Sequence, residues 1–349
     1  MDPKIKCLVW DLDDTLWQGT LQEDEAGIKL RPEIINVLDA LDRRGIIQSI
    51  ASRNNWEQVK TKLEELGVGQ YFLYPQCHFN SKALSMEKIA KELNIGLDTL
   101  ALIDNDPFER FEINYYFPQI RTYDAGQYPD LPDYPEFQMS HATEESENRR
   151  QYMQARARRE EARKEHKGSR EQFLKECGMK LGIRLARKED YPRVVELSHR
   201  TNQMNSLLER IDMTFVDSYC EQDGNYLYVA KLEDRFGAHG LIGTCFINTA
   251  DAEINLDLFC ISCRIEGRGI ASAFLYAVLE KLGQQLPMAE TVRCRLVRKQ
   301  RNLPARLLLE MLGFKKSAAD DLESIYILQL PLPHKVFNWL EIGVMNDEP

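Results

Sequence analysis

An apolar run that ends in closely spaced carboxylates constrains this chain more than any other stretch. Residues Ile5–Trp10 are mostly apolar and predict a buried strand. Asp11, Asp13 and Thr15 follow it at intervals of two. A strand directs alternate side chains to opposite faces, but a chain that loops over after Asp11 can aim both carboxylates into one cavity. There they would share a hard divalent cation, which prefers oxygen ligands; the alternative is a strand followed by an acidic turn.

The N-terminal half alternates short apolar runs with amphipathic segments. The predicted strands are Ile5–Asp11, Ile46–Ala51, Tyr71–Tyr74 and Thr99–Ile103, and the predicted helices are Arg31–Arg44, Trp56–Leu66 and Lys82–Leu93. This alternation predicts a parallel sheet covered on both faces, with ligands at the carboxyl ends of the strands. Polar clusters follow three of the predicted strands, which favours one composite site at that edge.

The residue types of these clusters suit phosphoryl transfer. Asp11 is the expected nucleophile, which would form an aspartyl-phosphate, and Asp13 is the expected general acid and base. Asp104 would complete a Mg²⁺ shell together with Asp11. Catalysis of this kind consists of positioning and of neutralising charge on the phosphoryl oxygens.

The phosphoryl oxygens are expected to be held by Ser52 and Lys82, with Arg53 and Asn54 beside them. Each residue alone has an ordinary structural explanation. A lysine at a helix start is commonly solvated, and Ser52 can simply cap the following turn. Their order along the chain, each after a predicted strand, favours the functional interpretation.

These residues resemble the four motifs of the haloacid dehalogenase (HAD) phosphohydrolase superfamily, carried here by Asp11/Asp13/Thr15, Ser52, Lys82 and Asp104. The resemblance implies that Asp13 binds the metal through its main-chain carbonyl, which leaves its carboxylate free. The segments between the motifs are too short for a cap domain, so an open site is expected. Trp17 and Gly19 form either a small flap or a packed loop.

A proline- and tyrosine-rich connector, Gln127–Phe137, predicts a domain boundary. The following Glu144–His166 segment is rich in charges of alternating sign, which favours a solvated helix, and Gly168 separates it from a further helix through Cys177. The predicted organisation is a HAD-like domain at 1–140, a charged helical linker at 141–180, an α+β domain at 181–331 and a tail at 332–349.

Strand and helix signals resume in the C-terminal half, and a basic glycine turn lies between a predicted strand, Ile254–Ser262, and a predicted helix that ends at Leu282. Successive N–H groups at such a helix start form an anion site. The turn residues Arg264, Gly267, Arg268 and Gly269, together with Asn302 before the next helix, resemble the GNAT acetyltransferase fold. That resemblance implies binding of the pyrophosphate of coenzyme A, or of the phosphate of a phosphopantetheine arm.

Two further groups of residues are candidates for acyl chemistry. Cys263 lies beside Arg264 and a helix start, where a thiol becomes nucleophilic; the alternative is an inert half-buried cysteine. Cys260 and Cys263 also form Cys-x-x-Cys, although the absence of a second pair disfavours zinc or redox chemistry. Asn202 and Asn205 lie in an amide-rich segment at the end of a predicted helix. They either cap the helix or bind a polar acyl group.

A basic island stands out in a chain whose formal net charge is −10. It consists of Arg293, Arg295, Arg298, Lys299 and Arg301. These side chains form either a solvated face or a dock for an acidic carrier protein or a phosphorylated substrate, because local field governs encounter more than net charge does.

The order of these motifs over about Ile5 to Phe314 resembles the FkbH-like family. Its members are glyceryl transferase/phosphatases of polyketide biosynthesis that take D-1,3-bisphosphoglycerate, remove phosphate and load a glyceryl unit onto the phosphopantetheine thiol of an acyl carrier protein. The resemblance implies Mg²⁺ as cofactor and Cys263 as a candidate acyl carrier. Asn105 departs from the family, because many relatives have a second aspartate there.

Two rival functions remain open at this point. One is a phosphatase joined to a true acetyl-coenzyme A acetyltransferase, and the other is a phosphatase with a non-catalytic docking module. The acidic balance disfavours a nucleic-acid partner, and neither a membrane span nor a signal peptide is apparent. The eight cysteines lack disulfide-framework spacing, so a cytoplasmic protein with reduced thiols is expected.

Overall fold

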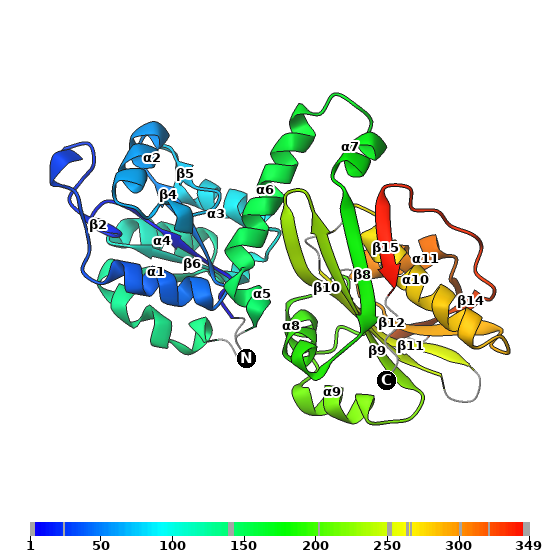
Figure 1. The fold of residues 1–349 in the computed structure, drawn as a ribbon. Coiled ribbons are helices and arrows are strands. Elements are labelled where there is room, and N and C mark those ends of the chain that lie inside the picture. Colours follow the sequence, from blue (N-terminus) through cyan, green and yellow to red (C-terminus); the bar gives the residue numbers. More distant parts are fainter. Residues whose placement is uncertain are drawn as a thin grey trace. The chain divides into compact units, whose positions relative to one another are not determined.

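The structure is a computed structural model that describes residues 4–23, 25–138, 143–201, 203–249, 253–262, 265, 267–299, 302–319 and 322–344. The chain forms two compact units, which are divided in the sequence between Gln154 and Ala155 (Figure 1). Each unit has its own sheet and its own buried core. No helix within the described ranges has the length and apolar character needed to cross a membrane.

Unit 1 is built on a five-stranded parallel sheet with the strand order β5–β4–β1–β6–β7. Its strands are β1 (Cys7–Trp10), β4 (Ile47–Ser52), β5 (Gln76–Cys77), β6 (Leu100–Asp104) and β7 (Arg121–Asp124). Its helices are α1 (Ile34–Arg43), α2 (Trp56–Glu65), α3 (Lys82–Leu93), α4 (Pro107–Tyr116), α5 (Glu144–Glu147) and the start of α6 (Arg149–Glu165).

The central strand β1 is buried on both faces. Leu8 and Trp10 belong to a core cluster with residues of α1 and α2, whereas Cys7 and Val9 belong to a second cluster with residues of α3 and α4. This double burial explains why β1 is a continuous apolar run rather than an alternating one. Because the strands are parallel, the polar residues that follow them lie at one edge of the sheet.

The predicted strand Tyr71–Tyr74 is wrong. A 3₁₀ turn covers Gly69–Tyr71, and the strand β5 begins only at Gln76. Tyr74 adopts a φ of 54°, a left-handed conformation that interrupts an extended strand. Apolar and aromatic content alone could not reveal this break.

A cap domain is absent from the described residues between β1 and α1. They form a small hairpin, β2 (Trp17–Gln18) paired with β3 (Lys29–Leu30), and a 3₁₀ turn at Glu25–Gly27. Trp17 is fully buried in the core, as expected for a packed loop, and lies in the β2–β3 hairpin.

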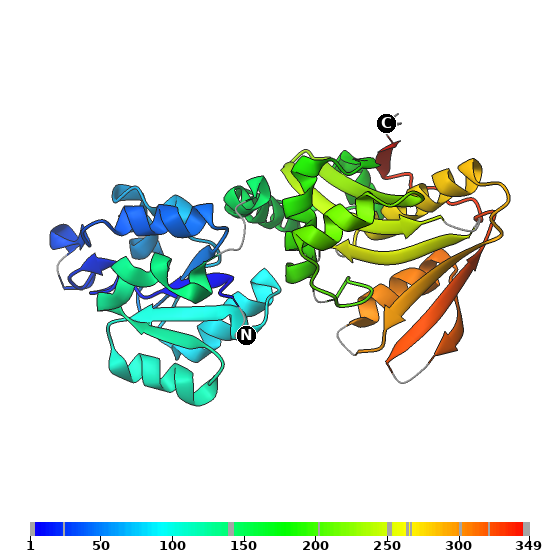
Figure 2. The ribbon, with the colours of Figure 1, turned by 90° about the horizontal axis from the view of Figure 1, so that it is seen from below.

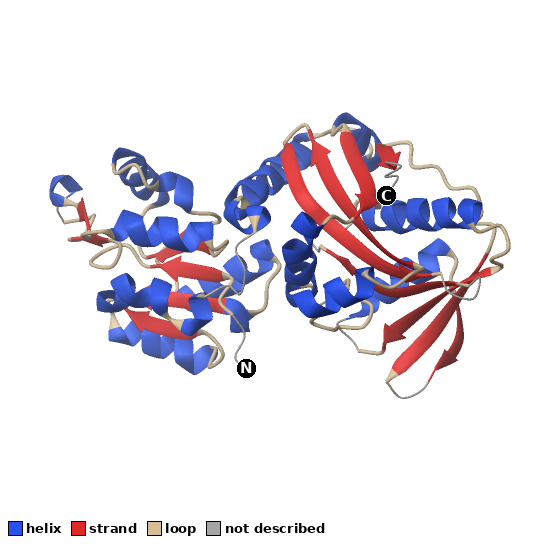
Figure 3. Ribbon diagram, turned by 60° about the horizontal axis from the view of Figure 1, so that its bottom comes forward, coloured by secondary structure: helices blue, strands red, loops and turns tan. Residues whose placement is uncertain are grey.

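Unit 2 is built on one mixed sheet with the order β13–β14–β12–β11–β10–β9–β8–β15, drawn in red in Figure 3. Its strands are β8 (Met179–Leu185), β9 (Asn225–Asp234), β10 (Gly237–Asn248), β11 (Ile254–Ile261), β12 (Thr291–Val297), β13 (Lys315–Ala319), β14 (Glu323–Gln329) and β15 (Leu340–Val344). The predicted fold class is confirmed: a capless parallel α/β domain precedes a separate α+β domain.

Helices cover both faces of the second sheet. They are α7 (Arg170–Glu176), α8 (Tyr191–Arg200), α9 (Met213–Cys220), α10 (Ile270–Gln285) and α11 (Leu303–Leu312). Residues of α8 and α9 share one core cluster with Val229 and Phe246. Residues of α10 and α11 share another with Ala230 and Cys245. Figure 2 shows the orange strands β13 and β14 at one end of this sheet.

The segment 144–166 was predicted as one helix and forms two, α5 and α6, with Asn148 between them. After it, Ser169 caps α7 through a capping box with Gln172, which agrees with the predicted break at Gly168. At the other end of the chain, β15 pairs in parallel with β8 over Leu340–Val344, within the segment predicted as a tail.

Candidate active site

The candidate active site of unit 1 lies at the carboxyl edge of the parallel sheet. Asp11 follows β1, Ser52 ends β4, Asp104 ends β6, and Lys82 is the first residue of α3. Ser81 caps α3 by accepting a hydrogen bond from the Ala83 amide at 3.1 Å. The cap fixes the start of the helix and therefore the position of the lysine that follows it.

Lys82 joins the two carboxylates that end β1 and β6. Its Nζ lies 2.6 Å from Asp11 Oδ1 and 2.6 Å from Asp104 Oδ2. Lys82 and Asp11 are only 4% and 6% exposed, and Asp104 is fully buried. Solvent cannot compensate these buried charges. Removing any one of the three groups would therefore leave the charge of the others uncompensated.

The charges of this cluster do not balance when all three groups are ionised. Burial raises the pKa of Asp11 to about 7; the charge of Asp104 adds to the rise and Lys82 opposes it. Burial alone would lower the pKa of Lys82, but Asp11 and Asp104 raise it above its ordinary value. Lys82 therefore stays charged, and when both carboxylates are ionised the site carries an excess of negative charge that a further cation would neutralise.

The residues present fit a magnesium ion. Mg²⁺ commonly takes one or two carboxylates and completes its shell with water and phosphate oxygens. Asp11 and Asp104 supply two buried carboxylates with excess negative charge. Within the described ranges, no group of three or more His, Cys, Asp or Glu side chains surrounds a metal position, so the remaining ligands would come from other oxygen atoms.

The carboxylate of Asp13 is held by three donors from two segments of unit 1. Asp13 Oδ1 accepts hydrogen bonds from Trp17 Nε1 at 2.9 Å and from the Leu21 amide at 3.0 Å. Its Oδ2 accepts one from Asn54 Nδ2 at 2.8 Å. The same Asn54 amide group lies 3.0 Å from Ser52 Oγ. The loop after β4 and the β2–β3 hairpin thus fix the orientation of Asp13 together.

We expect Trp17→Phe to lower kcat about tenfold with little change in KM, because misplaced general acids and bases lose part of their usual contribution. The substitution keeps a ring in the core but removes the donor to Asp13. Steady-state hydrolysis of p-nitrophenyl phosphate checks it, with Trp56→Phe, an exposed tryptophan of α2, as the matched control. Equal kcat values for the two variants would show that this bond does not position Asp13.

Two other predicted residues have specific partners. Arg53 Nη2 pairs with Glu109 Oε1 at 2.7 Å, and the Arg53 side chain is 46% exposed. Asn105 Oδ1 accepts a hydrogen bond from Thr15 Oγ1 at 3.2 Å, and the main-chain N–H of Asn105 donates to the same oxygen at 3.0 Å. The Thr15–Asn105 pair ties the loop after β1 to the loop after β6.

Glu109 is a residue that sequence reasoning did not place in the site. It lies in the first turn of α4, is 6% exposed, and leaves Oε2 without a hydrogen-bond partner. Burial raises the pKa of Glu109, while Lys82 and Arg53 act to lower it. Its position could have indicated that it belongs to the site, because it lies five residues after Asp104, at the start of the helix that follows β6.

In unit 2, the glycine turn before α10 has the expected backbone. Gly267 and Gly269 adopt φ values of 76° and 74°, which favour glycine. A Cβ on Gly269 would lie 3.0 Å from Trp339 Cζ2, so this position also lacks space for a side chain. The predicted residues Asn202, Cys263 and Arg264 lie outside the described residues.

The side chain of Arg268 lies in a buried charged cluster. Burial and the nearby Arg159 lower the pKa of Arg268 to about 10. Arg159 Nε donates to Asp234 Oδ2 at 2.7 Å, and His239 Nε2 lies 3.2 Å from the same oxygen. The side chain of Arg268 is thus part of the packing beneath the turn, while its backbone belongs to the turn itself.

We expect the β9–β10 hairpin to lose stability as the pH falls below about 6.5, the ordinary histidine pKa. Burial, Arg159 and Arg268 lower the pKa of His239 and outweigh its bond to Asp234, so the unfolded chain takes up a proton that the folded chain does not. Hydrogen exchange of hairpin peptides at pH 5.5 and 7.5 checks this, and His239→Gln should flatten the dependence. A wild-type dependence that persists in the variant would assign it to another group.

The segment Met204–Ser206 separates β11 from β12. Pairing of these parallel strands ends at Leu256 and Cys294. Beyond that point the Ile261 amide donates to Met204 O at 2.8 Å, and the Val297 amide donates to Ser206 O at 2.9 Å. A phosphopantetheine arm inserted between the two diverging strands would therefore find these two main-chain amides already bonded within the chain.

Asn205 and Asn302 hold this segment in place. Asn205 Nδ2 donates to Glu209 O at 3.0 Å and to Ser198 O of α8 at 3.4 Å, and its Oδ1 accepts from the Leu208 amide at 2.8 Å, so this side chain bridges the loop that follows α8. Asn302 Nδ2 donates to Ser206 O at 3.2 Å and to Val297 O at 3.0 Å. Asn302 Oδ1 is buried and has no partner, so it is an acceptor that suits an N–H or O–H of a ligand.

Cys260 lies in the core of β11 and is fully buried. Burial raises its pKa well above the ordinary thiol value, which makes it a poor nucleophile. Of the two cysteines weighed for acyl chemistry, Cys260 is therefore disfavoured by its surroundings.

Comparison with known proteins yields structural similarity without a family assignment. No family model matches the sequence, and no curated protein matches it. The N-terminal part of protein BF1531 from Bacteroides fragilis, which contains a phosphatase domain and was solved in complex with Mg, is 25% identical. The match covers 40% of this chain and 42% of that chain, with a TM-score of 0.37. The chain thus spans less than half of that structure.

Two acetyltransferases are among the other similar structures. The ribosomal-protein-S18-alanine N-acetyltransferase from Escherichia coli is 13% identical over 45% of this chain and 98% of its own, with a TM-score of 0.35. Mutant forms of the spermidine/spermine N-acetyltransferase SpeG from Vibrio cholerae are 15% identical over 43% of this chain and 93% of their own, with a TM-score of 0.33.

Proposed function

We propose that unit 1 is a Mg²⁺-dependent phosphatase. The observation that carries this proposal is the buried Asp11–Lys82–Asp104 cluster, in which one ammonium lies 2.6 Å from each of two carboxylates at the ends of neighbouring strands. Buried charges of this kind are costly to maintain for stability alone. Their position at the carboxyl edge of a parallel sheet is the usual place for a ligand site.

In this reaction each residue has a separate task. The Asp11 carboxylate attacks phosphorus, and the bond from phosphorus to the leaving oxygen breaks as Asp13 donates a proton to that oxygen. Asp13 then takes a proton from the water that hydrolyses the aspartyl-phosphate. Lys82 binds a phosphoryl oxygen, with Ser52 and Asn54 beside it. Mg²⁺ held by Asp11 and Asp104 would neutralise charge on the transferred group.

For the whole chain we propose glyceryl transfer coupled to dephosphorylation. The acyl phosphate of D-1,3-bisphosphoglycerate is activated, so a thiolate can attack its carbonyl carbon and release phosphate, which leaves a thioester. The second phosphate is an ester and would need the site of unit 1. Support comes from the ordered motifs that resemble the FkbH-like family, and the acceptor would be the phosphopantetheine thiol of an acyl carrier protein.

Cys263 is the proposed acyl carrier within unit 2, through a glyceryl–S–Cys263 thioester. The burial of Cys260 supports this choice over its neighbour. Cys263→Ala is expected to abolish loading of the carrier protein and to leave phosphate release from simple phosphate esters intact. Cys260→Ala is the matched control and should load normally; full loading by Cys263→Ala would refute the covalent step.

The decisive experiment is intact mass spectrometry of the enzyme and a holo acyl carrier protein after incubation with Mg²⁺ and D-1,3-bisphosphoglycerate. The proposal expects a glyceryl adduct on the carrier protein that disappears with Asp11→Asn. Phosphate release without any adduct would leave a phosphatase alone. An adduct that persists with Asp11→Asn would separate the transfer step from unit 1.

A second candidate is a phosphatase whose unit 2 binds a partner without catalysing transfer. The occupation of the β11–β12 edges by Met204–Ser206 favours it, because a thioester arm would have to displace this segment. In that case carrier-dependent dephosphorylation would survive both Cys263→Ala and Cys260→Ala.

A further inference from the structure

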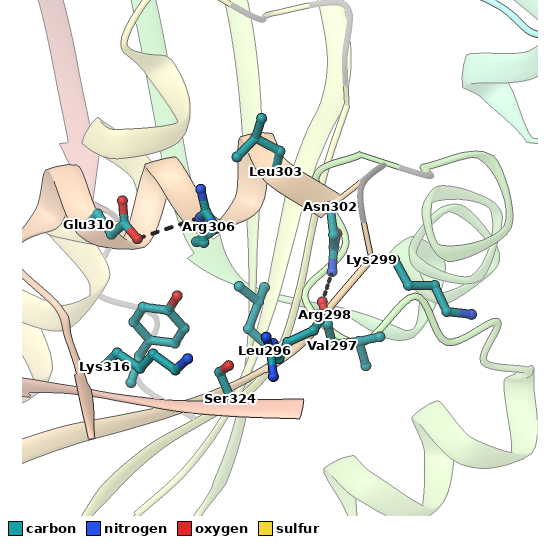
Figure 4. A pocket seen from close by; sticks show the side chains of 11 residues that line it. Leu296, Val297, Arg298, Lys299, Asn302, Leu303, Arg306, Glu310, Lys316 and Ser324 are labelled. Atoms are coloured by element: carbon teal, nitrogen blue, oxygen red, sulfur yellow. Dashed lines mark hydrogen bonds and ion pairs between the residues drawn. The ribbon is translucent and has the colours of Figure 1, made fainter. Parts of the chain in front are cut away.

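A basic pocket lies on unit 2 beside α11. Its wall is the helix α11, its floor is formed by β12 and β14, and Arg298, Lys299 and Asn302 line one end (Figure 4). The cavity measures about 390 Å³, within the range of small-molecule sites. Asn302, which the GNAT resemblance assigns to phosphopantetheine binding, also lines this cavity. No lining residue within the described ranges belongs to α10 or to the glycine turn before it, so the two candidate sites share one residue.

The charge of the pocket is opposite to that of the chain. Four cations line it, Arg298, Lys299, Arg306 and Lys316, against the single carboxylate of Glu310. Arg306 and Glu310 are paired at 3.6 Å, and both side chains are about half exposed. Such an exposed ion pair contributes little to stability. Arg306 could therefore leave Glu310 and bind an anion without a large cost in free energy.

The basic residues of this region fall on two faces of the sheet. Lys316 pairs in register with Tyr326, which lines the pocket, whereas Lys315 pairs with Ile327 on the opposite face. Arg293 is also in register with Ile327 and does not line the cavity. The basic island predicted from the sequence is therefore divided: Arg298 and Lys299 line the concave site, Arg293 and Arg295 do not, and Arg301 lies outside the described residues.

The floor of the pocket is polar and buried. Ser324 and Asn302 are each 2% exposed and Tyr326 is 3% exposed, and all three line the cavity. Both hydrogens of the Asn302 amide are committed to main-chain carbonyls, which leaves its unpartnered Oδ1 as an acceptor. A flat protein-docking patch would not need hydroxyl and amide groups recessed in a cavity, so a small ligand explains the pocket better.

We propose that this pocket binds a small molecule through a dianionic phosphate group. Arg298, Arg306 and Lys316 would take the phosphate oxygens, and Asn302 Oδ1 would accept a hydrogen bond from the body of the ligand. Arginine forms paired hydrogen bonds with phosphate oxygens, which suits a cleft that holds two of them. This site is a second phosphate site, distinct from the one at which unit 1 would cleave its substrate.

Lysine acetylation followed by peptide mass spectrometry tests the proposal on the full chain, with inorganic phosphate as the probe. At a phosphate concentration four times the dissociation constant, labelling of Lys316 should slow about fivefold, since the fraction of unoccupied sites is the reciprocal of one plus that ratio. Lys315, the adjacent residue on the other face, should label at an unchanged rate. Sodium chloride at equal ionic strength should give no protection.

Two charge-matched double variants make the result specific. Arg298→Ala/Arg306→Ala removes two cations from the pocket and should abolish protection of Lys316. Arg293→Ala/Arg295→Ala removes two from outside it and should leave protection intact. Equal protection of Lys315 and Lys316, equal protection by chloride, or no protection by phosphate would overturn the proposal. Protection by an acidic carrier protein but not by phosphate would assign the surface to protein docking instead.

Discussion

Replacing Asp11 with asparagine is expected to lower phosphate release by about 10⁴-fold or more, the scale seen when a catalytic nucleophile is removed. The amide is nearly isosteric but cannot form the aspartyl-phosphate. It also removes a carboxylate whose pKa burial raises to about 7. Hydrolysis of p-nitrophenyl phosphate with saturating Mg²⁺ measures the effect.

Asp14→Asn is the matched control for this variant. Asp14 lies three residues further along the same loop, is exposed, and has a φ of 50° that asparagine tolerates well. Its activity should stay within about twofold of wild type, the scatter expected at an exposed site without a catalytic role. Comparable activity losses in both variants would indicate general disruption of the loop rather than loss of a nucleophile.

Lys82→Met is expected to destabilise unit 1 by about 3–5 kcal/mol at pH 8 in the absence of Mg²⁺ and to abolish phosphatase activity. Removing one partner from a buried ionic cluster leaves the remaining charges uncompensated. Asp11 and Asp104 would then face each other without the ammonium that lies 2.6 Å from each. Urea unfolding followed by tryptophan fluorescence measures the change in free energy.

The sign of the pH dependence tests the same explanation. Loss of Lys82 raises the pKa of Asp11 further, so the folded state takes up a proton and the destabilisation should shrink as the pH is lowered toward 5. Lys88→Met, on the exposed side of the same helix, should change stability by less than about 0.5 kcal/mol. A penalty for Lys82→Met that is independent of pH would point to lost packing instead of uncompensated charge.

The parallel domain was the most predictable part of the chain. Its central strands β1 and β6 are fully buried and are marked by apolar runs, and the residues after β1, β4 and β6 had to meet at one edge. The sequence could not show how they meet. The hydrogen bonds of Trp17 and Asn54 to Asp13, and the pairing of Arg53 with Glu109, depend on the conformations of loops. A periodic sequence pattern does not predict these conformations.

The second domain was less predictable because its distinctive features are long-range. Residues Met204–Ser206 read as a helix exit, but they pair with β11 and β12, which lie about 50 and 90 residues further along the chain. The predicted strand Tyr71–Tyr74 was wrong for the opposite reason. One residue in a left-handed conformation, Tyr74, ends a run whose composition is typical of a strand. The division of the basic island between two faces likewise depends on register, which a one-residue slip would reverse.

The strand β15 has a consequence for how the protein is handled. It pairs with β8 from Leu340 to Val344 at the end of the eight-stranded sheet, and so covers backbone groups that would otherwise form a bare edge. A chain cut before Leu340 would present the N–H and C=O groups of β8 as a template for strands of other molecules. Such a truncation should favour aggregation during expression, and an affinity tag is better attached with this strand left intact.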